Sequence, residues 1–142
     1  MHLRNEVIAR YRTVAVVGLS PRSDRHSHEV AQYLQLRGYR IIPVNPTTAG
    51  QSILGETCYP TLSEAASILA KTGVDIEIVN CFRRSEDIGL IADEAIAIGA
   101  NCLWMQLDIV NVAAAARAEA AGLIVVMDRC LKIEHMRATS LA

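Results

Sequence analysis

Five short runs of valine, isoleucine and other apolar residues constrain the fold of this chain more than any other feature of its sequence. None of the runs alternates apolar with polar residues, as a strand with one solvated face does. Continuous apolar runs of this length are typical of strands buried on both faces, and therefore of a parallel sheet covered by helices. The runs are residues 13–19, 40–44, 76–82, 101–105 and 123–127.

Segments with helical spacing of apolar residues separate the runs. The clearest is residues 85–98, where apolar residues recur every three or four positions and Gly99 marks the end of the helix. Strands that alternate with helices predict a doubly wound α/β fold with right-handed crossovers. With the strands numbered along the chain, we expect the order 3-2-1-4-5. The predicted helices are residues 29–38, with a start near Ser27, and residues 60–69, 85–98 and 108–121.

Length and composition predict one domain over residues 1–142, because a chain of this size with 51% hydrophobic residues can bury a core of its own. The longest apolar stretches fall well short of the ~18 residues that suggest a membrane span. The first twelve residues mix arginine with glutamate and contain no apolar segment of a secretory signal. We therefore expect a cytoplasmic protein that does not associate with membranes.

Charge is unevenly distributed along the chain. Residues 1–40 carry seven arginines and three acids, whereas residues 41–100 carry eight acids and three basic residues. No run of basic residues with interleaved aromatics is present, which argues against a nucleic acid partner. Arg22 and Arg25 lie in a polar loop between two apolar segments, where the planar guanidinium group suits a phosphate.

The four cysteines are too far apart in the sequence for a zinc site. Cys81 and Cys102 lie inside apolar runs, so we expect them in the core. Cys130 follows the last run and is next to Arg129, which favours the thiolate, and we expect it to be the most reactive of the four. The alternative is that Cys130 is a structural thiol.

The loop after the first strand is the first place to look for a ligand, because ligands of doubly wound sheets bind at the carboxyl ends of the strands. Gly18 begins this loop as in a dinucleotide fingerprint, but Ser20 and Ser23 stand where the later glycines would be. The longer loop leaves space for a larger array of phosphates, although it could also be a capped surface loop. The candidate phosphate ligands are Ser20, Ser27 and either Arg22 or Arg25.

The ends of the second and third strands carry further candidates. Asn45 stands where an NAD-binding domain has an acid for the ribose, which argues against NAD. Phe82 and Arg83 end the third strand, where a ring and a guanidinium group could flank an adenine. The alternative is that Phe82 only closes the edge of the sheet.

Together these segments resemble the small stand-alone CoA-binding proteins, which are similar to the CoA-binding domain of the succinyl-CoA synthetase α subunit. The resemblance covers nearly the whole chain and implies a Rossmann-like three-layer αβα sandwich with a five-stranded parallel sheet that binds coenzyme A. The motifs that carry it are VAVVGLSPRSDRHS (14–27), YLQLRGYRIIPVNP (33–46), ILGETCYPTLSEA (53–65), CFRRSED (81–87), GANCLWMQL (99–107) and AGLIVVMDRCLKIEH (121–135).

The resemblance also implies a role for individual residues. It assigns the phosphates to the first loop, the adenosine half to the ends of strands 2 and 3, and the pantetheine arm to the remaining strand ends. The chain departs from the family pattern at His26, His28 and Asp108, and at Glu77, a charged residue in a buried strand that must find a partner. The implied ligand residues are Gly18, Leu19, Ser20, Arg22, Arg25 and Ser27, then Val44, Asn45, Pro46, Phe82 and Arg83, then Gln106 and Cys130.

These observations favour a non-catalytic binding or regulatory module for coenzyme A or an acyl-CoA. The strand ends offer no convincing pair of nucleophile and base. The alternatives are a small NAD(P)-binding oxidoreductase and an accessory subunit of an acyl-CoA enzyme. The sequence leaves open a protein partner or a homo-oligomer.

Overall fold

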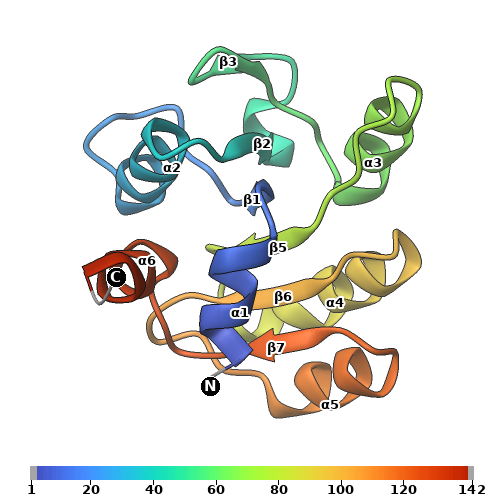
Figure 1. The fold of residues 1–142 in the computed structure, drawn as a ribbon. Helices are drawn as coiled ribbons and strands as arrows, with labels where there is room; N and C mark the ends of the chain where they lie inside the picture. The colour runs from blue at the N-terminus through green and yellow to red at the C-terminus, as the bar shows by residue number, and fades with distance from the viewer. Residues whose placement is uncertain (1–2, 141–142) are drawn as a thin grey trace.

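The computed structural model describes residues 3–140, so the ends of the predicted domain, residues 1–2 and 141–142, lie outside the described residues. A five-stranded sheet forms the middle layer, and helices cover both of its faces (Figure 1). Every strand pairs with its neighbours in parallel, which confirms the predicted α/β fold. The strands are β1 (Thr13–Val17), β2 (Arg40–Val44), β5 (Ile78–Cys81), β6 (Cys102–Met105) and β7 (Ile124–Val126).

The strand order is β2-β1-β5-β6-β7, so the expected order 3-2-1-4-5 is wrong and the order along the chain is 2-1-3-4-5. The third strand cannot lie outside β2 because another segment occupies that edge. The backbone N–H of Tyr59 donates to Pro43 O at 3.0 Å, and the N–H of Asn45 donates to Tyr59 O at 2.9 Å. Tyr59 follows a short hairpin of β3 (Ser52–Ile53) and β4 (Glu56–Thr57). Both orders bury the same apolar runs, and the apolar pattern alone could not distinguish them.

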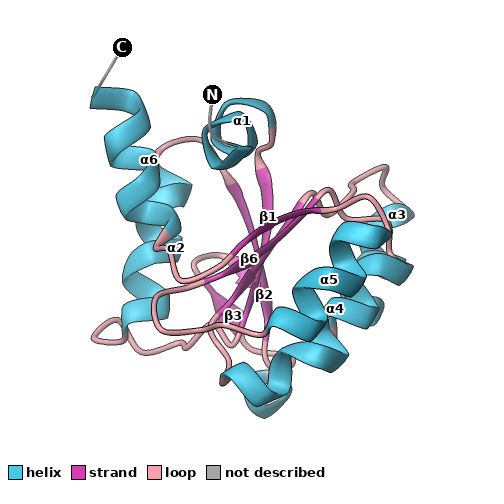
Figure 2. Cartoon of the chain, turned by 90° about the horizontal axis from the view of Figure 1, so that it is seen from below, coloured by secondary structure: helices cyan, strands magenta, loops and turns pink. Residues whose placement is uncertain are grey.

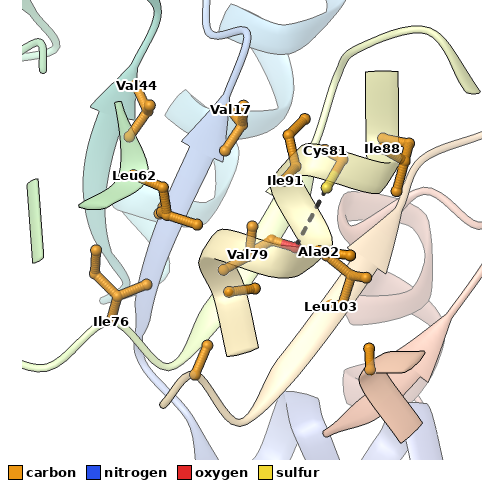
Figure 3. Close-up of a cluster of buried hydrophobic side chains, with 14 of the residues drawn as sticks. Val17, Val44, Leu62, Ile76, Val79, Cys81, Ile88, Ile91, Ala92 and Leu103 are labelled. Carbon is orange, nitrogen blue, oxygen red and sulfur yellow. Dashed lines mark hydrogen bonds between the residues drawn. The ribbon is translucent and has the colours of Figure 1, made fainter. Parts of the chain in front are cut away.

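Three helices cover each face of the sheet (Figure 2). Alternate residues of each strand point to opposite faces, so every strand contributes side chains to two apolar cores. Val17, Val79 and Leu103 point to one face (Figure 3), and Val16 and Trp104 point to the other. This burial on both sides explains the continuous apolar runs. The helices are α3 (Leu62–Ala70), α4 (Ile88–Ala97) and α5 (Val112–Ala120) on one face, and α1 (Leu3–Arg10), α2 (His26–Leu36) and α6 (Leu131–Ser140) on the other.

The sequence pattern misses the first and last helices because each has little apolar surface in the core. Helix α1 buries only Val7 and Ile8, and the buried residues of α6 include the polar Glu134 and His135. Helix α5 begins later than predicted because the Asn111 side chain caps it, accepting a hydrogen bond from Ala114 N at 3.0 Å. None of the helices between residues 3 and 140 combines the length and the apolar character needed to cross a membrane.

The Glu77 carboxylate is paired with two backbone N–H groups. Its Oε1 atom accepts the backbone N–H groups of Arg12, at 3.0 Å, and of Thr13, at 3.1 Å. Both donors lie where the chain enters β1, so this carboxylate holds the segment before β5 against the start of the central strand.

We expect Glu77→Ala to lower the free energy of unfolding by about 1–3 kcal/mol, because two backbone donors lose their acceptor. Urea denaturation measures the change. Glu119→Ala removes an exposed carboxylate of α5 and serves as the control, with an expected change within about 0.5 kcal/mol. Equal stability of the two variants would contradict the role given to Glu77.

Candidate functional site

A cavity of about 320 Å³ opens between the loop after β1 and the start of α2, and we call it the loop cavity. It lies at the carboxyl edge of the sheet, where the sequence analysis places the ligand. Six of the predicted ligand residues line it. These are Gly18, Ser20, Arg22, Arg25, Ser27 and Phe82, and His26 joins them.

Hydroxyl groups fix the conformation of this loop. Ser27 Oγ accepts a hydrogen bond from Ser20 N at 3.0 Å, and Ser20 Oγ accepts one from Arg22 N at 3.1 Å. Because both hydroxyl oxygens act as acceptors here, their own hydrogens remain available to a ligand. The serines therefore both shape the loop and can donate to an anion.

The N-terminus of α2 adds further donors to the loop cavity. The N-cap residue, Arg25, makes no side-chain hydrogen bond to the first turn, so the N–H groups of that turn have no side-chain cap. His26 and Ser27, the first residues of the helix, line the cavity. The helix dipole and free N–H groups at such an end attract anions.

Two guanidinium groups make the same place electropositive. Arg22 pairs with Asp24 at 3.0 Å, but both side chains are more than 60% exposed, and such surface pairs contribute only ~0–1 kcal/mol. Within residues 3–140, no carboxylate lies within 4.0 Å of Arg25. Both arginines are therefore available to a phosphate, which guanidinium groups bind through paired hydrogen bonds.

Gly18 joins three strand ends at the base of the loop cavity. Its N–H donates to Val44 O at 2.7 Å, and its backbone has a φ of +92°, in the region that favours glycine. A Cβ atom at this position would lie 2.6 Å from the carbonyl oxygen of Phe82. The close approach of β1 to the end of β5 therefore requires glycine.

A second cavity, also about 320 Å³, lies on the other side of the same strand ends, and we call it the groove. The two cavities are adjacent. Val17 and Arg83 line the groove, and the residues bonded to them in the chain, Gly18 and Phe82, line the loop cavity. Val44 and Pro46 contribute apolar surface. Val44, Pro46 and Arg83 were predicted from the sequence. The rest of the lining was not, and it includes the apolar Pro60, Leu62, Leu90 and Ile91 and the carboxylates of Glu86, Asp87 and Glu94.

Two of the predicted ligand residues hold the loops together instead of lining either cavity. Leu19 is fully buried in the core. The amide of Asn45 donates to Leu19 O at 3.1 Å and accepts from Thr47 N at 3.1 Å. Both the nitrogen and the oxygen of the Asn45 amide therefore have hydrogen-bond partners within the protein.

Gln106 and Cys130 lie deeper than the sequence analysis implied, since each is only 2% exposed. Gln106 Oε1 accepts the N–H of Leu131, the first residue of α6, at 3.0 Å. Cys130 belongs to the apolar core on the α2 and α6 face. Neither residue lines the loop cavity or the groove.

All four thiols are buried, so none of them is exposed as a reactive cysteine would be. Desolvation raises the pKa of Cys81 to about 12 and also raises the pKa of Cys102. These two residues lie in the core, as predicted. The expected reactivity of Cys130 gains no support, because its side chain is as inaccessible as theirs.

Two aspartates with positive φ mark the other strand ends of this edge. Asp108 has a φ of 69° and Asp128 a φ of 57°, values that cost free energy for a residue other than glycine. Asp108 N donates to Asp128 Oδ1 at 2.7 Å, which links the loops after β6 and β7. Asp108, one of the departures from the family pattern, therefore occupies a backbone conformation that favours glycine.

Comparisons with known proteins found a matching family model, a relative and several similar solved structures. A model described as a CoA binding domain matches residues 12–136. The uncharacterized protein YneT of Bacillus subtilis is 41% identical over 130 residues, which cover 92% of this chain and 90% of that protein. The structure of a hypothetical protein from Pyrococcus horikoshii has a TM-score of 0.85 and 34% identity, covering 96% of this chain and 89% of that chain. The Rex-family repressor RSP, solved with β-NADH, shares the fold with a TM-score of 0.60 and 14% identity, covering 92% of this chain and 60% of its own.

We expect Gly18→Ala to lower the free energy of unfolding by about 2–4 kcal/mol, because the methyl group adds a clash to the cost of a positive φ. Gly38→Ala is a matched control, since Gly38 has a φ of +93° and a Cβ atom added there would meet no heavy atom within 4 Å. The control should lose about 1 kcal/mol. Equal losses in urea denaturation would contradict the close approach at Gly18.

Proposed function

Because this chain belongs to the family of CoA-binding domains, we propose that it binds coenzyme A or an acyl-CoA at the carboxyl edge of the sheet and does so as a non-catalytic module. The observation that carries the proposal is the pairing of an electropositive loop cavity with an adjacent groove that is partly apolar. Coenzyme A has matching parts, since its pyrophosphate lies between an adenosine that carries a 3′-phosphate and a long pantetheine arm.

The phosphates are assigned to the loop cavity. Arg22 and Arg25 supply charge, and the hydroxyls of Ser20 and Ser27 supply donors. The N–H groups at the start of α2 add donors that point in one direction and require no movement of the protein. Three kinds of anion ligand at one place favour a ligand with several phosphate groups over one with a single carboxylate.

The adenosine half is assigned to the groove. Val44 and Pro46 offer apolar surface to the base, and the guanidinium of Arg83 can stack on its ring. Phe82, on the loop-cavity side, separates this half from the pantetheine arm. The arm is assigned to the α2 and α6 side of the sheet edge, because the groove on the other side is assigned to the adenosine.

NADH is the competing ligand, since a repressor with the same fold was solved with it. Two features of this chain oppose that alternative. Ser20 and Ser23 replace glycines that let a dinucleotide pyrophosphate approach the backbone. Asn45, at the end of β2, uses its amide to hold Leu19 O and Thr47 N, and it offers no carboxylate to the ribose.

We expect isothermal titration calorimetry to show tighter binding of coenzyme A than of NAD or NADH. The physical reason is that the loop cavity is built for more phosphate charge than a dinucleotide brings, and the end of β2 lacks the ribose acceptor. A dissociation constant for either dinucleotide at or below that for coenzyme A would contradict the proposal.

We expect Arg25→Ala and Arg22→Ala each to weaken binding of coenzyme A by about 10- to 100-fold, as the loss of charge-assisted hydrogen bonds implies. Arg117→Ala is the control, because Arg117 lies on α5 and pairs with Asp93 away from both cavities. Repeating the titrations with dephospho-CoA identifies the arginine that contacts the 3′-phosphate, since its effect then shrinks. Unchanged affinity in both variants would exclude the loop cavity as the phosphate site.

A further inference from the structure

Three buried side chains near the loop cavity carry polar atoms without a hydrogen-bond partner among residues 3–140. The atoms are both ends of the Asn80 amide, the amide nitrogen of Gln106 and the Nδ1 atom of His28. The three residues are 0%, 2% and 8% exposed, respectively. Burial without a partner costs ~1–3 kcal/mol for each such group. A set of this size is unusual beside a sheet whose other buried strand residues are apolar, and a partner from outside the chain would satisfy it.

The strand register places Asn80 and Gln106 on the same face of the sheet. Asn80 is paired with Val16 of β1 and Trp104 of β6, and both of these neighbours belong to the core on the α2 and α6 face. Gln106 follows Trp104 by two residues and so points the same way. Its other amide atom is held by Leu131 N at the start of α6.

His28 approaches the same region from the first turn of α2. The starts of α2 and α6 are neighbours, because Lys132 Nζ lies 2.7 Å from Glu29 Oε1. Figure 1 shows these two helices side by side on this face of the sheet. The three side chains therefore lie between the sheet and the facing ends of both helices.

Phe82 stands between these polar atoms and the loop cavity. It follows Asn80 by two residues, so its ring lies on the same face but nearer the carboxyl edge, where it lines the cavity. The ring makes an edge-to-face contact with His26 at 5.9 Å. The ring is half-buried and packs against the edge of the core on the α2 and α6 face.

We propose that His28, Asn80 and Gln106 receive an amide of the pantetheine arm when the Phe82 ring moves aside, an inference that rests on the proposed binding of coenzyme A. The Asn80 amide offers N–H donors and a carbonyl acceptor, which complement the C=O and N–H of a secondary amide. Gln106 adds a donor, and His28 adds a donor or an acceptor according to its tautomer. The pantetheine arm carries two secondary amides, whereas the nucleotide half of coenzyme A carries none.

The test compares coenzyme A with adenosine 3′-phosphate 5′-diphosphate, its nucleotide half, by calorimetry. Asn80→Leu keeps the size of the side chain and removes both polar atoms, so it is expected to fold at least as well as the natural chain. We expect it to weaken binding of coenzyme A about tenfold or more and to leave the nucleotide within about twofold. His28→Phe, which keeps the ring shape, should show the same selectivity with a smaller loss.

Ile78→Val is the matched control, because Ile78 lies on the same strand and the same face as Asn80 but is apolar. It should change the two affinities equally or not at all. If the natural protein binds neither compound, the proposed function fails. Two results would overturn the pantetheine assignment while the natural protein still binds both compounds. One is that Asn80→Leu retains full affinity for coenzyme A, and the other is that it loses both ligands equally. In either case the proposed function stands.

Discussion

Burial of the parallel sheet on both faces is the constraint on which the rest of this structure depends. Because helices cover both faces, strand residues must be apolar, and polar chemistry is confined to the strand ends. The carboxyl ends of β1, β2 and β5 meet at one edge, so loops that are distant in sequence form one site there. Gly18 ties this edge together, since it contacts the ends of both neighbouring strands. Among the buried residues of the five strands described, Asn80 is the polar exception, and its position next to the site is the basis of its proposed role.

The site combines a rigid part with a part that can adapt. Ser20, Ser27 and Asn45 use their hydrogen-bonding groups to hold the loops after β1 and β2 in a fixed relation. The side chains of Arg22, at the loop cavity, and Arg83, at the groove, are more exposed and only weakly paired, so they can turn toward a ligand. A preformed set of donors lowers the entropic cost of binding, while the mobile guanidinium groups add charge where it is needed.

The sequence predicted the strands well because they depend on local patterns, and it directed attention to the loop after β1. The apolar runs mark β1, β2, β5, β6 and β7, and the residues that follow β1 do line a cavity. The strand order was not predictable in this way, because it depends on Tyr59 pairing with the edge of β2. The amide of Asn45 bonds to a residue of another loop, and one asparagine inside the apolar run of β5 leaves no periodic signal. Contacts of this kind are decided by the tertiary structure, so only the structure could reveal them.

The most direct measurement is a crystal structure of the protein with coenzyme A. We expect the pyrophosphate at the start of α2, within hydrogen-bond distance of Ser27 and Arg25, and the adenine in the groove beside Pro46 and Arg83. A ligand that leaves the loop cavity empty and binds elsewhere, for example between α1 and α6, where Ile8 and His135 line another cavity, would contradict this assignment.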